Sequence, residues 1–411
     1  MEQKIHLYPI LNHRYFCNFL LKLQLLSKVK KDVQKLWDEP IWWHVINMEI
    51  DMRLNFFLSG VVLSIMLASA QGHAAQNNHK ARQTRPIQLG VSGGSVVDKV
   101  HNACCSGTLG SLVRDKAGNL YILSNTHVLA GDSAIGNNKK VSAKGDPINQ
   151  PGYIDVNCSQ NTADYVAILS NWISIVPNGV TSVDAAIAQI DTHMVDTSGS
   201  ILEIGKISST PVAAFVGQKV KKSGRTSGLT RGAVTGLHAT ITVGYTDECG
   251  GNEFDSTFHD QILVGPGAFL KGGDSGSLMV EDVAVNPRPV GLLFAGSDTV
   301  AVANPIQDVL DALDISFVGI KTADSKPKAA FFTKISSNTA KVKAIKDKHS
   351  EMLLQIDGVV GHAVGVSKDD STTHTILVLV ESLTDEVRNL VPNQLDGVSV
   401  EVLEVGKIKA F

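Results

Sequence analysis

Residues 272–277 read Gly272-Gly273-Asp274-Ser275-Gly276-Ser277. A serine between glycines on a tight turn can expose its hydroxyl, and a glycine just before it lets backbone N–H groups converge on one point. Such convergent N–H groups are what an oxyanion hole requires. Serine is a weak nucleophile at neutral pH, so a base and a carboxylate that orients it must also be present. Position 277 is Ser, so the Gly-x-Ser-x-Gly elbow of the α/β-hydrolases is absent.

A histidine and an aspartate stand in strand-end contexts upstream of Ser275. His127 follows the predicted apolar strand Leu120–Ser124, and Asp184 opens the string Asp-Ala-Ala-Ile-Ala. Asp164 also precedes an apolar stretch and stays open as an alternative to Asp184, although the surroundings of Asp184 are favoured. Three further histidines lack this context and are interpreted as surface residues: His193, His238 and His259. Asp274 is expected to make a structural ion pair or hydrogen bond.

The order His127, Asp184, Ser275, with these local strings, resembles the trypsin/chymotrypsin serine-protease family. This order separates the chain from subtilisin-like proteases and from α/β-hydrolases. The match runs from about Gly90 to Gly319. Four stretches further resemble the bacterial relatives of the plant narrow-leaf trypsin-like proteins: Cys105–Gly110, Leu123–Leu129, Gly145–Gly152 and Lys222–Gly228.

The resemblance implies a role for each of these residues. Ser275 becomes the nucleophile, His127 the general base and acid, and Asp184 the residue that orients His127. The N–H groups of Gly273 and Ser275 become the oxyanion hole. The implied fold is mainly β, with two six-stranded antiparallel β-barrels of the chymotrypsin-like kind. The implied activity is that of a serine endopeptidase acting on proteins or peptides through an acyl-enzyme. A catalytically silent, protease-like binding or scaffold protein is the alternative.

The specificity pocket of this family is lined by the segment before the nucleophile and by a later strand, here 267–271 and 293–296. Phe269 stands where trypsin-like specificity would place an acidic residue, so cleavage after Arg or Lys is not favoured. Phe269, Phe294 and Gly296 predict a small or apolar P1 residue. In the alternative interpretation, Phe269 and Phe294 are simply core residues.

The hydrophobic pattern by itself indicates a β-rich chain with a different C-terminal part. Short apolar runs separated by Gly, Asn, Asp and Ser predict an antiparallel sandwich or barrel over residues 90–320. Pro305 precedes apolar residues at helical spacing and predicts a helix there. Residues 321–340 are interpreted as a linker. Residues 341–411 predict a small α/β accessory domain that could serve as an interaction module, an intramolecular chaperone or a regulatory cap.

The sequence of the N-terminal part predicts an export signal. Residues 52–70 combine a basic start, an apolar run of about 13 residues and a small-x-small ending, which is typical of a signal peptide. The apolar run is too short for a membrane anchor, which needs about 20 residues. We therefore expect residues 1–51 to be a mis-assigned upstream extension and residues 71–89 to be a flexible lead-in. The protein is expected to be secreted or periplasmic, with no stable membrane anchor after cleavage.

Composition narrows the remaining function classes. With 37 Lys and Arg against 40 Asp and Glu, and 43% hydrophobic residues among 411, the chain is globular. It has no long basic run and only 6% aromatic residues, so nucleic-acid binding is not expected. No Cys-x-x-Cys pair occurs, so we expect neither metal nor cofactor.

Four cysteines follow the predicted signal peptide and allow three full disulfide pairings: Cys104, Cys105, Cys158 and Cys249. Adjacent Cys104 and Cys105 should take different partners or stay unpaired. Oligomeric state is left open.

Overall fold

The structure is a computed structural model. It describes residues 79–100, 103–131, 141–159, 161–321, 329–370 and 372–410. The predicted upstream extension (1–51), the predicted signal peptide (52–70) and residues 71–78 lie outside the described residues. Within the described ranges, no helix is long and apolar enough to span a membrane.

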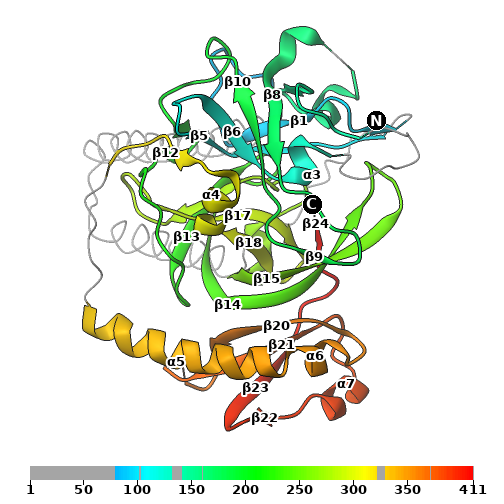
Figure 1. The fold of residues 1–411 in the computed structure, drawn as a ribbon, viewed down its shortest axis with the longest axis vertical. Coiled ribbons are helices and arrows are strands. Elements are labelled where there is room, and N and C mark those ends of the chain that lie inside the picture. Colours follow the sequence, from blue (N-terminus) through cyan, green and yellow to red (C-terminus); the bar gives the residue numbers. More distant parts are fainter. Residues whose placement is uncertain are drawn as a thin grey trace, which may run out of the picture. The chain divides into compact units, whose positions relative to one another are not determined.

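The first sheet has eight strands in the order β19-β5-β6-β10-β8-β7-β1-β4, at the top of Figure 1. They are β1 (Val91–Ser95), β4 (Gly107–Leu109), β5 (Ser111–Arg114), β6 (Leu120–Ser124), β7 (Pro147–Asn149), β8 (Tyr165–Trp172), β10 (Ala186–Ile190) and β19 (Ser316–Phe317). Neighbouring strands pair antiparallel, and the register sets Ala186 of β10 opposite Ser124 of β6. This register brings the chain just before β10 next to the chain just after β6, where Asp184 and His127 lie.

The second sheet has twelve strands, with β24 paired to both β14 and β17. They are β9 (Val180–Thr181), β13 (Lys219–Gly224), β14 (Gly228–Thr246), β15 (Glu253–Gly265), β16 (Leu278–Glu281), β17 (Pro289–Gly296), β18 (Ala301–Pro305), β20 (Val359–Val366), β21 (His374–Val380), β22 (Gln394–Leu395), β23 (Val398–Glu404) and β24 (Lys409–Ala410). A pairing between β14 and β15 closes the strands from β13 to β18 into a ring. This ring contains six strands, whereas the two sheets contain eight and twelve strands in all. The chain is thus mainly β, and the predicted division into two six-stranded barrels is not confirmed for the first sheet.

The remaining elements are short apart from one helix. They are β2 (Lys99–Val100), β3 (Ala103–Cys104), β11 (Ser200–Ile201), β12 (Gly205–Lys206), η1 (Tyr153–Val156), η2 (Thr162–Asp164), η3 (Gly267–Phe269), α3 (Thr126–Leu129), α4 (Ile306–Leu313), α5 (Ala329–Lys348), α6 (Ser350–Leu354) and α7 (Asp385–Leu390). The predicted helix after Pro305 is confirmed as α4. It buries Ile306, Val309, Leu310 and Leu313 at the helical spacing read from the sequence.

Two predictions about flexible segments were wrong. The lead-in (71–89) is ordered from residue 79 onward, because Ile87 and Leu89 are buried and bridge to Val195 and Ile201. The linker (321–340) is helical from residue 329, since α5 begins at Ala329. Lys and Ala, which suggested a linker by composition, are also strong helix formers.

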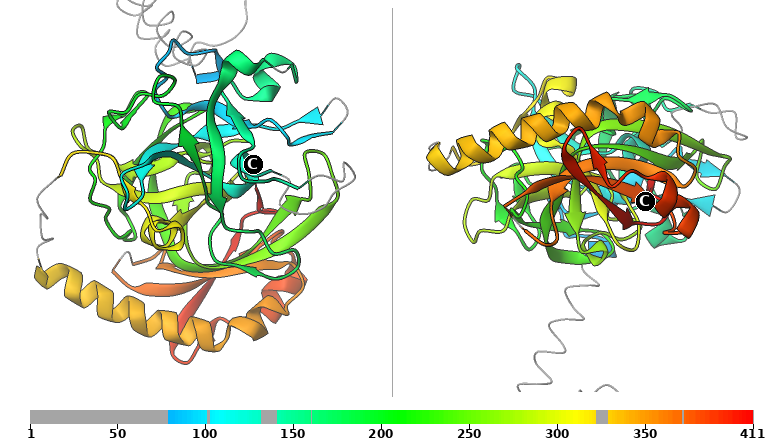
Figure 2. Two further views of the ribbon diagram at one scale, coloured as in Figure 1. Left: turned by 45° about the horizontal axis from the view of Figure 1, so that its top comes forward. Right: turned by 90° about the horizontal axis from the view of Figure 1, so that it is seen from below.

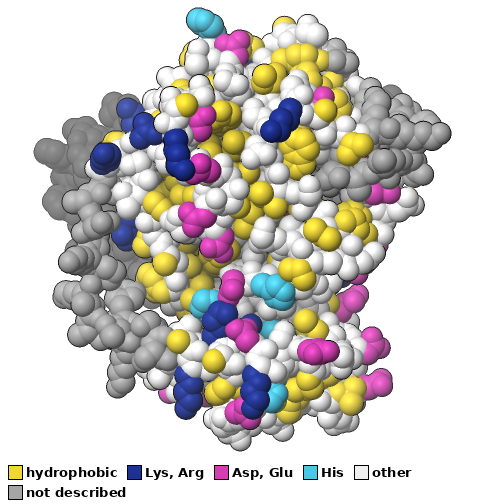
Figure 3. All heavy atoms as spheres, viewed as in Figure 1, with side chains coloured by type: hydrophobic (Ala, Val, Ile, Leu, Met, Phe, Trp, Pro, Cys, Tyr) yellow, Lys and Arg dark blue, Asp and Glu magenta, His cyan; other side chains and the backbone are white. Residues whose placement is uncertain are grey.

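The C-terminal strands are continuous with the second sheet. β20 pairs antiparallel with β14, and β21 and β23 follow beside it, with α5, α6 and α7 close to them in Figures 1 and 2. The apolar side chains of this part form a cluster of their own, which includes Val342, Leu353 and Val378. The predicted α/β unit (341–411) therefore adds strands to the second sheet by backbone hydrogen bonds. On the face drawn in Figure 3, basic and acidic side chains lie interspersed.

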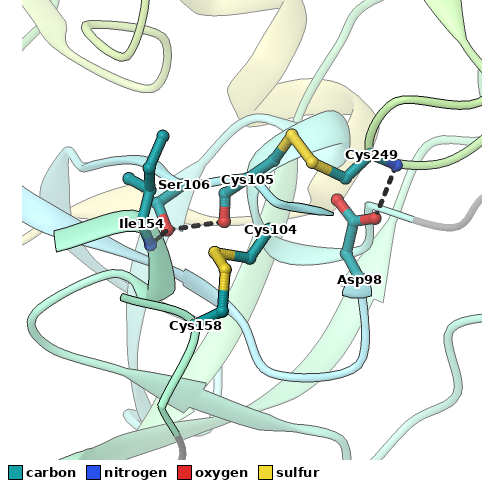
Figure 4. The surroundings of a disulfide bond; sticks show 7 residues. All are labelled: Asp98, Cys104, Cys105, Ser106, Ile154, Cys158 and Cys249. Atoms are coloured by element: carbon teal, nitrogen blue, oxygen red, sulfur yellow. Dashed lines mark hydrogen bonds between the residues drawn. A yellow bond between two sulfur atoms is a disulfide. The ribbon is translucent and has the colours of Figure 1, made fainter. Parts of the chain in front are cut away.

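Two disulfides tie residues 104 and 105 to distant parts of the chain. Cys104 is bonded to Cys158 and Cys105 to Cys249 (Figure 4). The expectation that these adjacent cysteines take different partners is confirmed, because neighbouring side chains of an extended segment point in opposite directions. The Cys249 N–H also donates to Asp98 Oδ1 at 2.9 Å. The segment around Cys105 and the β14–β15 turn are thus fastened together.

Candidate active site

Ser275 lies on a turn between β15 and β16 of the second sheet, and this turn contacts β4 of the first sheet. The turn follows η3 and precedes β16, and Gly273 and Gly276 have φ angles of +91° and +90°. The Ser275 carbonyl accepts the N–H of Thr108 on β4 at 2.8 Å. A Cβ at Gly276 would lie 2.0 Å from Ser124 Oγ, so only glycine fits there. The turn is therefore held in one conformation by hydrogen bonds and close packing.

Asp274 is anchored by a buried lysine. Lys222 Nζ lies 2.9 Å from Asp274 Oδ2, and both side chains are fully buried. The other carboxylate oxygen accepts the N–H groups of Thr226 and Ser227 at 2.8 and 3.0 Å. Burial lowers the pKa of Lys222, and the charge of Asp274 opposes this shift. The expected structural ion pair of Asp274 is confirmed, whereas its partner had not been predicted.

His127 and Asp184 lie in contact. His127 is on α3, directly after β6, and its Nδ1 is 2.5 Å from Asp184 Oδ2. Asp184 Oδ1 accepts the Thr126 N–H at 2.7 Å, and the Asp184 N–H donates to Asn304 Oδ1 at 2.9 Å. The Asp184 carboxylate is fully buried, while 17% of the His127 side chain is exposed. A buried carboxylate thus holds the orientation of an accessible imidazole.

The alternative residues lie in other contacts. Asp164 is hydrogen-bonded to Arg82 at 2.5 Å, so the structure favours Asp184 as the partner of His127. His238 pairs with Asp260 at 3.0 Å, and His259 Nδ1 lies 3.2 Å from Thr240 Oγ1. The His193 N–H donates to Asp191 within an exposed turn.

Tyr245 is a site residue that the sequence did not reveal. It lies near the end of β14, and its hydroxyl donates to Asp184 Oδ2 at 3.0 Å. Its ring meets the His127 ring edge-on, with 6.0 Å between the centroids. Burial and the negative charge of Asp184 raise its pKa well above the usual 10. The hydroxyl therefore stays protonated and keeps donating to Asp184. A tyrosine 61 residues from its partner leaves no local sequence signal.

The Ser275 hydroxyl donates to the carbonyl oxygen of Phe294 at 3.1 Å. Within the described part of the chain, the backbone N–H groups of Gly273 and Ser275 have no hydrogen-bond acceptor. A cavity of about 390 Å³ adjoins the turn and is lined by His127, Gly273 and Tyr245, among others. Two unpaired N–H donors beside a serine and a cavity are suited to bind a developing oxyanion.

The residues expected to form the specificity pocket lie in different places. Phe269 and Phe294 are buried in two apolar clusters, 1% and 0% exposed, which favours their interpretation as core residues. Gly296 is at the end of β17 and pairs with Lys409 of β24. Among the described residues, no group of three His, Cys, Asp or Glu side chains is arranged to hold a metal ion.

Two mainly antiparallel sheets, the Ser275 turn and the His127–Asp184 pair define a protein of the trypsin-like fold class. The chain belongs to the family described as Nal1 C-terminal domain, whose sequence model matches residues 88–303, a little more than half of the chain. The finer resemblance, to bacterial relatives of plant narrow-leaf proteins, stays a prediction. No curated protein sequence matches the chain.

Several solved structures are similar over part of the chain. One is a glutamic-acid-specific serine protease, with 18% identity and a TM-score of 0.38 over 56% of this chain and 100% of that one. A Nocardiopsis protease has 15% identity and a TM-score of 0.37 over 57% and 99% of the two chains. Protease A of Thermobifida fusca has 16% identity and a TM-score of 0.36 over 57% and 98%.

Proposed function

We propose that the protein is a serine endopeptidase in which Ser275, His127 and Asp184 act as the catalytic triad. The observation that carries the proposal is the 2.5 Å contact between His127 Nδ1 and the buried Asp184 carboxylate, beside a cavity shared with the Ser275 turn. A buried carboxylate that holds an imidazole in one orientation is the arrangement that activates a serine.

Catalysis begins when the Ser275 hydroxyl turns from the Phe294 carbonyl toward His127. Its oxygen attacks the peptide carbonyl carbon while His127 takes the proton, and the N–H groups of Gly273 and Ser275 stabilise the oxyanion. Collapse of this intermediate breaks the C–N bond, and His127 returns the proton to the leaving amine. Water, activated by His127, then hydrolyses the acyl-enzyme and frees Ser275.

The proposed substrates are proteins or peptides, and we expect the residue before the cleaved bond (P1) to be small or apolar. Export to the periplasm or the exterior is a separate proposal that rests on the sequence of residues 52–70 alone. A silent protease-like binding protein is the second candidate, favoured by one observation: the Ser275 side chain is buried and hydrogen-bonded to Phe294.

A fluorophosphonate probe separates the two candidates. We expect the probe to label the native chain covalently and to leave Ser275→Ala and His127→Ala unlabelled, because attack needs both the nucleophile and its base. Ser170→Ala, which removes a hydroxyl from β8, is the matched control and should label like the native chain. Labelling is also measured on a chain that ends at Gly406 and therefore lacks β24, whose residues line the same cavity as His127. Absence of Ser275-dependent labelling in both folded chains would establish the binding-protein alternative.

Tyr245→Phe tests whether the tyrosine hydroxyl positions the His127–Asp184 pair. Phenylalanine keeps the ring that packs on His127 but removes one donor to the carboxylate. We expect labelling to slow about 10-fold, since a hydrogen bond to a charged group contributes about 1.5 kcal/mol. Tyr121→Phe removes a similar bond of 2.9 Å, to the partly exposed Asp115 directly after β5 of the first sheet, and should not change labelling. Equal rates for both variants would remove Tyr245 from the site.

A further inference from the structure

The C-terminal strand β24 lies between two strands beside the candidate site. It pairs antiparallel with β17, with Gly296 opposite Lys409 and Ala295 opposite Ala410. It also pairs with β14 at Gly244, and the Gly244 N–H donates to the Ile408 carbonyl at 3.0 Å. An extended peptide added to exposed strand edges in this way uses the binding mode of β-augmentation.

The strand shares its cavity with the candidate catalytic residues. The same cavity is lined by His127 and Gly273 and by Lys409 and Ala410. In Figure 1, β24 is drawn in red next to α3, the helix that carries His127. Because β24 runs antiparallel to β17, it advances from Gly296 toward Phe294, the residue that accepts the Ser275 hydroxyl. The tail is therefore directed along β17 toward the nucleophile.

Side chains of the tail alternate between two environments. Ile408 is 1% exposed and packs in the apolar cluster that contains Phe294 and Tyr245. Lys407 and Lys409 point the other way, and each Nζ lies 3.4 Å from the Glu253 carboxylate. An extended peptide with an apolar residue between two basic ones fits these contacts.

The tail is tethered closely to this slot. Only Val405 and Gly406 separate Glu404, the last residue of β23, from Lys407, and Gly406 has a φ of +74° that allows the chain to turn there. A short tether gives a segment a millimolar effective concentration at its site. A free peptide that needs the same slot must compete with it.

We propose that residues 407–410 are a pseudo-substrate that occupies the peptide-binding slot of the same chain. The slot between β14 and β17 takes extended peptides of the pattern basic–apolar–basic–small, and a substrate enters when the tail leaves. The proposal rests on the proposed endopeptidase function for its consequence, but the slot and its occupant are defined by contacts that do not involve catalysis.

Binding is measured first, in a Ser275→Ala background, so that catalysis plays no part. The probe is a fluorescein-labelled peptide with the sequence of residues 404–410, and fluorescence anisotropy follows its binding to the full chain and to a chain ending at Gly406. We expect the shortened chain to bind about 100-fold more tightly, the factor for a slot that is open in about 1% of molecules. A peptide with both lysines replaced by glutamate is the control and should bind weakly.

A second variant guards against misfolding of the shortened chain, which loses the buried Ile408. The double substitution K407E/K409E keeps Ile408 but sets two acidic residues against Glu253, so it should also open the slot. Adding E253K restores the attraction between position 253 and positions 407 and 409. Residues 407–410 should then occupy the slot again and weaken peptide binding. Equal peptide binding by the full chain, the shortened chain and K407E/K409E, all folded by circular dichroism, would overturn the proposal.

Fluorophosphonate labelling of the same chains with Ser275 intact distinguishes this proposal from the proposed function. Faster labelling of the shortened chain and of K407E/K409E supports both. Labelling at equal rates in all chains overturns the pseudo-substrate and leaves the protease. Absence of labelling with unchanged differences in peptide binding supports the slot and its occupant and removes the protease.

Discussion

Asp184→Asn should reduce Ser275-dependent labelling about 10⁴-fold while the chain stays folded. The carboxylate accepts hydrogen bonds at both oxygens, from the Thr126 N–H at one and from His127 and Tyr245 at the other. An asparagine that keeps its oxygen toward Thr126 turns its amide toward His127 Nδ1. The imidazole must then accept at Nδ1 and carry its proton at Nε2, so it cannot take the Ser275 proton.

The control for this prediction is Asp164→Asn. Asp164 was the alternative in the sequence, and its carboxylate is hydrogen-bonded to the half-exposed Arg82. We expect unchanged labelling rates for this variant, measured under the same conditions with matched circular dichroism spectra. If Asp164→Asn lost labelling and Asp184→Asn kept it, the assignment of the carboxylate would be reversed.

The candidate site was predictable because its main residues carry local signals. Ser275 sits in a glycine-rich turn, and His127 and Asp184 flank apolar strands, so each can be found in a window of a few residues. Tyr245 and Lys222 carry no such signal, because their roles come from a strand register and from burial beside an aspartate. Such contacts join residues about 50 to 60 positions apart and are set by packing, which a local pattern does not contain.

The fold was predictable at the level of strand content and not of strand grouping. Short apolar runs indicated antiparallel strands, but nothing in residues 359–366 announces that β20 will pair with β14 more than 100 residues earlier. Composition was misleading at residues 79–89 and 329–340. The first segment is mostly polar but contains the buried Ile87 and Leu89, and the second is rich in Lys and Ala, which suit a helix as well as a linker. Phe269 was ambiguous because an aromatic residue near a cleft fits both core and pocket.

Asp274→Asn should cost about 3–5 kcal/mol of unfolding free energy, the range for breaking a buried ion pair from one side. The substitution leaves Lys222 buried without its ion-pair carboxylate, beside the neutral acceptors Ser227 Oγ and the Gly228 carbonyl. Lys222→Met should cost less, because the carboxylate left behind keeps backbone donors such as the Thr226 N–H. We therefore expect Asp274→Asn to lower the free energy of unfolding more than Lys222→Met does.

The pH dependence of the Asp274→Asn variant follows from the same contacts. Burial already lowers the pKa of Lys222, and removing the opposing charge of Asp274 lowers it further. Between this folded-state pKa and the unfolded value of about 10.4, the unfolded chain binds more protons, so stability rises with pH. Urea unfolding at pH 7 and pH 9 should show the variant regaining stability relative to the native chain.

The control for the buried pair is an exposed one. Asp282→Asn, which breaks the pair with Arg231 at 3.2 Å, should cost less than about 1 kcal/mol of unfolding free energy. Similar losses for the two aspartate variants would mean that Lys222 is solvated, and the buried pair would not be what holds the Ser275 turn.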